Sequence, residues 1–153
     1  MHEHFFTLAA GIAKHATCGR DLCGAVIVKN GDVIGEGWNS PPGNSEDQRM
    51  CAVEEYDWLK KKKSDKTCCM HAEWRAIIDA LRRHPDEILG STLYLTRINT
   101  EGSILKSGEP YCTVCSRLAL DVGIAHFALW QESGIRVYRT DEYNQSSYAF
   151  HKE

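Results

Sequence analysis

The cysteine pair Cys112-Thr-Val-Cys115 can do metal chemistry because its thiols are three residues apart at the predicted start of a helix. Residues i and i+3 of a helix share a face, so both sulfurs can reach one zinc ion at roughly 2.3 Å. The positive end of the helix dipole also favours the thiolate forms that bind metals. Taken alone, such a pair also fits a redox site or half of a structural zinc site.

A second pair, His71 and Glu73, stands where another helix is expected to begin. At a first turn, both side chains can converge on an ion that lies beyond the N-terminal end. His71 with Cys112 and Cys115 makes three protein ligands, the arrangement of a catalytic zinc site that keeps one position for water. Zinc lowers the pKa of that water toward ~7, which makes hydroxide available, and the Glu73 carboxylate can carry the proton to a substrate nitrogen.

These residues resemble the signature His-x-Glu, followed by Pro-Cys-x-x-Cys, of the zinc-dependent cytidine and deoxycytidylate deaminase superfamily. Segments 24–29 and 35–43 are also similar to the first hairpin and the substrate loop of deoxycytidylate deaminases, so the resemblance covers residues 22–123. It implies hydrolytic deamination of a cytosine-type nucleoside or nucleotide, of the cytidine, deoxycytidine or dCMP class. The implied cofactor is Zn2+, and the implied catalytic residue is Glu73.

The resemblance also implies which residues contact the substrate. Asn39 would hydrogen-bond the sugar or the base, although the same side chain could simply shape the Pro-Pro loop that follows it. The backbone of Ala72 would position the base, and the Cys115 amide would lie near the carbon that carries the amino group. We expect Tyr111 or Trp130 to stack on the base.

The sequence departs from the family pattern at three places. Tyr111 separates the proline from the first cysteine, and Arg75 occupies the position of a family asparagine, which puts a deoxycytidylate-type pocket in question. The third departure is a long loop over residues 98–109, which ends beside the metal-binding cysteines. We expect this loop to cover the site and select the substrate, with Arg97 or Lys106 meeting any phosphate.

The elements that must position these residues follow from hydrophobic periodicity and turn signals. We expect helices over residues 3–17, 53–62, 71–83 and 113–121 and from 141 onward, and strands over 25–29, 33–38, 92–97, 126–131 and 135–139. Asn30-Gly31 predicts a tight hairpin between the first two strands. The helix residues expected to face the core are Phe5, Leu8, Ala9, Ile12, Ala16, Ala76, Ile77, Ala80 and Leu81.

This order of elements predicts an α/β fold, because helices on both faces of a mixed sheet bury such a pattern. Only residues 132–134 join the last two strands, which is too short for a parallel crossover, so these strands should be antiparallel. The resemblance implies a three-layer α/β/α sandwich around a five-stranded mixed sheet. At 153 residues, we expect one zinc-dependent deaminase domain spanning residues 1–153.

The composition indicates in which cellular compartment the protein works and which partners it binds. The formal net charge of −3 disfavours a nucleic-acid partner, and the chain has no apolar run long enough to cross a membrane. The odd number of cysteines, 7, without an export signal, favours a cytoplasmic protein with reduced thiols. We expect a small-molecule partner, namely a nucleobase, nucleoside or nucleotide, and a homo-oligomer that buries the apolar strands 127–130 and 135–138.

Five further cysteines could be buried and unreactive or could hold a second, structural zinc: Cys18, Cys23, Cys51, Cys68 and Cys69. Alternative functions also stay open. The same zinc chemistry could deaminate another free amino-heterocycle, such as guanine or a modified base, or a base within a nucleic acid. A non-enzymatic zinc-binding module is disfavoured by Glu73 and by the missing fourth ligand.

Overall fold

The computed structural model describes residues 1–18, 21–51 and 67–150. Its helices are α1 His2–Ala13, α3 Ala72–Arg83, α4 Thr113–Asp121 and α5 Thr140–Ala149, with short 3-10 turns at Pro42–Asn44 and Glu46–Gln48. Its strands are β1 Leu22–Lys29, β2 Asp32–Trp38, β3 Thr92–Ile98, β4 Ile104–Leu105, β5 His126–Gln131 and β6 Gly134–Arg139. The helix predicted over residues 53–62 lies outside the described residues.

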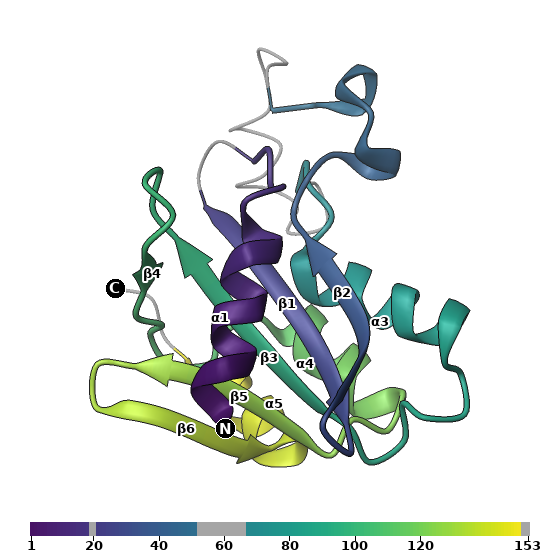
Figure 1. The fold of residues 1–153 in the computed structure, drawn as a ribbon, viewed down its shortest axis with the longest axis vertical. Helices are drawn as coiled ribbons and strands as arrows, with labels where there is room; N and C mark the ends of the chain where they lie inside the picture. The colour runs from purple at the N-terminus through teal and green to yellow at the C-terminus, as the bar shows by residue number, and fades with distance from the viewer. Residues whose placement is uncertain (19–20, 52–66, 151–153) are drawn as a thin grey trace.

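The strands form one mixed sheet in the order β2-β1-β3-β5-β6, and the short β4 pairs with β3. β3 and β5 run parallel, and the other neighbours are antiparallel. Helix α1 covers one face, and α3, α4 and α5 cover the other (Figure 1). The predicted three-layer α/β fold is therefore confirmed, as is the antiparallel pairing of the last two strands.

Two apolar cores lie on opposite sides of the sheet. Because successive strand residues point to opposite faces, Leu93 and Leu95 of β3 pack into the core under α3 and α4, while Tyr94 packs into the core under α1. The same alternation on β5 sends Leu129 to the α3 side and Trp130 to the α1 side. This alternation decides which side chains can reach the predicted metal site.

The hairpin between β1 and β2 turns at Asn30 and Gly31, as predicted. Both residues have positive φ, 52° and 85°, as a type I′ turn requires. Farther along β2, Gly35 and Gly37 lie so close to α3 that an added Cβ would overlap the carbonyl oxygens of Ala76 and Ala72. These two glycines allow the first turn of α3 to press against the sheet.

Helix α1 is shorter than predicted, since it ends at Ala13 instead of residue 17. The chain leaves the helix because the Thr17 N–H donates to the carbonyl oxygen of Asn39, 3.1 Å away in the loop after β2. The prediction that Leu8 and Leu81 face the core is also wrong, because they are 38% and 41% exposed.

The long loop predicted over residues 98–109 is wrong in part, because much of this segment is paired. The Asn99 N–H donates to the carbonyl oxygen of Ser103 across a turn, and Ile104–Leu105 then returns beside β3 as β4. Gly102, in the turn, lies against Lys14 at the end of α1. The tip of this hairpin therefore lies beside the end of α1, and a role of the segment as a cover over the predicted metal site stays a prediction. Among the described residues, no helix is long and apolar enough to cross a membrane.

Candidate metal centre and active site

His71 is the residue immediately before α3, with extended backbone. The preceding residue fixes its position, because the Met70 N–H donates to the carbonyl oxygen of Ser40, 2.9 Å away. The imidazole stacks on Trp74, with ring centroids 4.0 Å apart and planes inclined by 4°. This stacking and the Met70 contact hold the ring at the N-terminal end of α3.

The cysteine pair begins α4, as predicted. Cys112 is the N-cap residue, and its sulfur accepts a hydrogen bond from the Cys115 N–H at 3.4 Å. Cys115 lies in the first turn and is fully buried. The backbone of the helix start therefore orients both thiols toward the same point.

The two helix starts bring the predicted ligands together across the core. The His71 Nδ1 atom lies 3.2 Å from the Cys115 sulfur and 3.6 Å from the Cys112 sulfur. The two sulfurs are 2.6 Å apart. With a carboxylate oxygen of Glu73, these donor atoms all lie within 4.8 Å of one another. A nitrogen and two sulfurs are donors that zinc prefers, so the residues present fit this metal.

The charges of the cluster favour a cation. Hydrogen bonds with Cys115 and then with His71 lower the pKa of the Cys112 thiol to about 4. Burial raises the pKa of Cys115 well above its usual range. Burial opposes protonation of His71, but the hydrogen bond with Cys112 and the charge of Glu73 raise the pKa of the imidazole overall. The cluster thus holds protons at positions where a metal ion could replace them.

Glu73 is a buried carboxylate inside this cluster. It lies in the first turn of α3 and is only 5% exposed. Burial raises the pKa of its carboxyl group, while the neighbouring His71 opposes that rise. A raised pKa makes the carboxyl group a better proton acceptor, which suits a general acid–base that must take up and return a proton.

Asn39 uses its side chain to hold the loop after β2. Its Oδ1 accepts from the Cys23 N–H at 2.8 Å, and its Nδ2 donates to the carbonyl oxygen of Asp21 at 2.6 Å. These contacts match the loop-shaping alternative, and a contact with substrate stays a prediction. Asp21 was not a predicted site residue, and Cys23 was considered only as a buried thiol or a ligand of a second zinc. The alternation of β1 could have placed Cys23, because Ala25 and Ile27 face α3.

The two aromatic candidates for stacking lie in different surroundings. Tyr111 adjoins Cys112 of the cluster, is 66% exposed and contacts the ring of Phe150, with centroids 5.7 Å apart. Trp130 contacts Phe6 of α1 at 5.7 Å, on the opposite face of the sheet from α3 and α4. The sheet thus separates Trp130 from the cluster, and the prediction that it stacks on the base is corrected.

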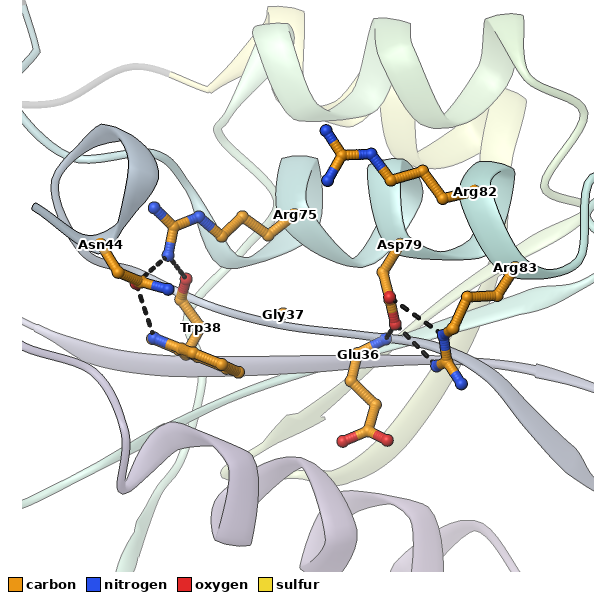
Figure 2. A pocket seen from close by; sticks show the side chains of 8 residues that line it. All are labelled: Glu36, Gly37, Trp38, Asn44, Arg75, Asp79, Arg82 and Arg83. Carbon is orange, nitrogen blue, oxygen red and sulfur yellow. Dashed lines mark hydrogen bonds and ion pairs between the residues drawn. The ribbon is translucent and has the colours of Figure 1, made fainter.

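Arg75 holds the loop of residues 38–44 on α3. Its guanidinium donates to the side chains of Ser40 and Asn44 and to the carbonyl oxygen of Pro41, the last at 2.7 Å. Figure 2 shows the contact of Arg75 with Asn44, which lies beside a surface pocket of about 410 Å³ along β2 and α3. The residues lining the pocket include none of the four in the metal cluster. Arg75 therefore acts on the loop and not on the metal.

The remaining cysteines differ from the predicted set of reduced thiols. Cys18 and Cys69 form a disulfide, so they are not available together as zinc ligands. Burial, followed by the charge of Glu73, raises the pKa of Cys23 to about 12, which keeps it a neutral thiol. Within the described part of the chain, the His71 cluster is the one group of at least three potential metal ligands close together.

Comparisons with known proteins agree with this geometry. The family model for the cytidine and deoxycytidylate deaminase zinc-binding region matches residues 1–130. A deoxycytidylate deaminase of Mycobacterium phage D29 is 30% identical over 142 residues, which cover 86% of this chain and 94% of the phage protein.

Two solved structures share the fold. The dCMP deaminase of cyanophage S-TIM5, in complex with dCMP and dUMP, superposes with a TM-score of 0.57 and 23% identity, covering 82% of this chain and 76% of that protein. Cytidine deaminase from Burkholderia pseudomallei superposes with a TM-score of 0.59 and 16% identity, covering 94% and 95% of the two chains.

Proposed function

We propose that this chain, a hydrolytic deaminase of the cytidine and deoxycytidylate deaminase family, acts on a free cytosine-type nucleotide. The proposed zinc site is formed by His71, Cys112 and Cys115. The observation that carries this proposal is the buried Glu73 carboxylate among one nitrogen and two sulfur donors. Three ligands of this kind leave room for water beside the carboxylate.

Zinc bound at these residues would supply Lewis-acid chemistry that lowers the pKa of water. The chain's own residues would do the rest. Glu73 would take a proton from the water that attacks the amino-bearing ring carbon and would give it first to the neighbouring ring nitrogen. Glu73 would then take the proton of the new hydroxyl group on that carbon and pass it to the amino group, so that the C–N bond breaks, ammonia leaves and the ring carbon becomes a carbonyl. The raised pKa of Glu73 suits this exchange.

A free nucleotide is favoured by the relatives and by the charge of the chain. The cyanophage relative binds dCMP and dUMP, and the net charge of −3 disfavours a general nucleic-acid surface. Asn39 and the Tyr111 ring would border the substrate, and the Ala72 backbone, at the start of α3, would position the base. Trp130 is left out because of its place on the other face of the sheet.

We also propose that the chain forms a homo-oligomer. Phe127 and Leu129 are already buried within the chain, so they are not the surface that would associate. Exposed apolar side chains do occur on or beside the packed helices α4 and α5, at Tyr111, Val114 and Tyr148, and Val137 of the predicted strand is also exposed. Light scattering at micromolar concentration should give at least twice the 17.3 kDa chain mass, and a monomer mass would contradict this proposal.

The test of the proposed function is a panel assay. Purified protein should contain zinc by elemental analysis and should release ammonia from deoxycytidine, cytidine or their 5′-monophosphates. Guanine and single-stranded DNA belong in the same panel, because they represent the alternative substrates. Activity on guanine or DNA alone would replace the proposed substrate class, and release of ammonia without bound zinc would contradict the metal assignment.

A further inference from the structure

An ion pair between Asp21 and Arg97 lies where β1 and β3 run side by side. Arg97 Nη1 lies 3.1 Å from Asp21 Oδ1, and the two side chains are 40% and 48% exposed. In the register of the two strands, Arg97 is directly opposite Cys23. Since Leu93 and Leu95 of β3 face α3, the alternation sends the side chain of Arg97 to that same face.

This face also carries the catalytic cluster. Cys23 packs at the margin of the core under α3, and the charges of Glu73, Asp21 and Arg97 all act on its thiol. Asn39 bridges the backbone of Asp21 and Cys23. The ion pair therefore stands at the rim of the space that contains the Glu73 carboxylate.

The second cation considered for phosphate binding points elsewhere. The ammonium group of Lys106 lies 3.7 Å from the centre of the Trp130 ring, which belongs to the α1 side. Only its backbone approaches Arg97, whose Nη2 donates weakly to the carbonyl oxygen of Lys106 at 3.5 Å. Of these two cations, Arg97 alone faces the cluster.

A substrate phosphate at this rim would need a nearby cation to bind. The Asp21 carboxylate lies at this rim and would repel a phosphate dianion. A guanidinium has five N–H donors in a planar fork that matches phosphate geometry, and the contacts to Asp21 and Lys106 use two of them. Arg97 can thus bind an anion while Asp21 limits its rotation.

We propose that Arg97 recognises the 5′-phosphate of the substrate and that Asp21 holds the guanidinium at the rim and competes with that phosphate. This inference rests on the proposed function and makes a nucleoside 5′-monophosphate the preferred substrate over the nucleoside. It assigns the preference to an ion pair whose partners are 76 residues apart in the sequence.

Three variants test the inference: Arg97→Gln, Asp21→Asn and, as the matched control, Lys106→Gln. The readout is kcat/KM for deoxycytidine 5′-monophosphate and for deoxycytidine, together with calorimetric binding of both to each protein. Arg97→Gln should lower kcat/KM for the monophosphate by about 10- to 100-fold, mainly through KM, and far more than for the nucleoside. Lys106→Gln should leave the ratio of the two substrates as in the wild type.

The Asp21→Asn variant tests whether the Asp21 carboxylate competes with the phosphate for Arg97 or only holds the guanidinium in place. The variant removes the competing charge and keeps the backbone contact with Asn39. It should raise the preference for the monophosphate. Equal losses for both substrates in Arg97→Gln, or equal binding of both by the wild type, would overturn the inference. These outcomes are separate from failure of the proposed function, which would appear as a wild-type protein that deaminates neither compound.

Discussion

Gly37 of β2 lies directly against the backbone of Ala72, the first residue of α3. Ala72 stands between the proposed ligand His71 and the proposed proton carrier Glu73. The missing side chain at position 37 therefore sets how closely the N-terminal end of α3, which carries these two residues, approaches the sheet. A contact between two small residues thus determines the position of the two functional ones.

Replacement of Gly37 by alanine should displace α3, because the new Cβ would overlap backbone atoms of Ala72 and Ala76. We expect a loss of about 1–3 kcal/mol of unfolding free energy, as for other overpacked cores, together with weaker zinc retention. Urea denaturation and elemental analysis measure both effects. Gly11→Ala is the control, since its Cβ meets nothing within 4 Å and should stabilise the exposed face of α1. Equal stability of the two variants would contradict the close-contact argument.

The Glu73→Gln variant should keep zinc and fold while losing activity. Glutamine preserves the shape of the side chain but cannot accept the proton from water, and general acid–base help is typically worth ~10²–10⁴-fold in rate. Steady-state ammonia release and metal content should be measured on the same preparation. Loss of zinc together with activity would instead make Glu73 a structural residue or a ligand.

The Cys112→Ser variant should lose zinc and stability together. Zinc at 100 to 1,000 times its Kd stabilises a protein by about 2.7–4.1 kcal/mol, and this contribution disappears with the site. A chelator should lower the melting temperature of the wild type and have little effect on the variant. Cys51→Ser is the control, because Cys51 is exposed and lies outside the cluster. Full zinc occupancy in Cys112→Ser would contradict the ligand assignment.

The Arg75→Lys variant should loosen the loop of residues 38–44. A lysine keeps the charge but cannot donate in a planar fork to Asn44 and the carbonyl oxygen of Pro41 together. We expect destabilisation by about 1–3 kcal/mol and a raised KM, because the loop contains Asn39. Arg82→Lys is the matched control, since Arg82 lines the same pocket and Figure 2 draws no contact from it to Trp38 or Asn44 of the loop. If the two variants have equal KM and equal stability, Arg75 does not position the loop.

Local signals in the sequence were sufficient for most of the elements and for the cluster of potential metal ligands. Two cysteines three residues apart at a helix start predict a shared ligand position, and Thr113–Asp121 forms the helix that was expected. Asn30-Gly31 predicts its hairpin because few residues adopt positive φ without strain. Such signals act over a few residues, so no knowledge of the fold is needed to interpret them.

Other predictions failed or stayed open because they depended on contacts between distant segments. Trp130 was predicted to stack on the base, but the phase of β5 within the sheet turns it toward α1. The end of α1 depends on a hydrogen bond between Thr17 and Asn39. Strand β4 has only two residues, too few for an alternating hydrophobic pattern to predict it.

The sequence by itself determined the chemistry of the cluster, because the types and local spacing of His71, Glu73 and the two cysteines carry it. Only the tertiary structure decided which charges border the cluster. Arg97 and Lys106 are equally good cations in the sequence, and they differ because the sheet sends Arg97 toward Glu73 and lets Lys106 lie over Trp130. Strand register and the face of a sheet are set by packing of the whole chain, and local patterns do not contain that information.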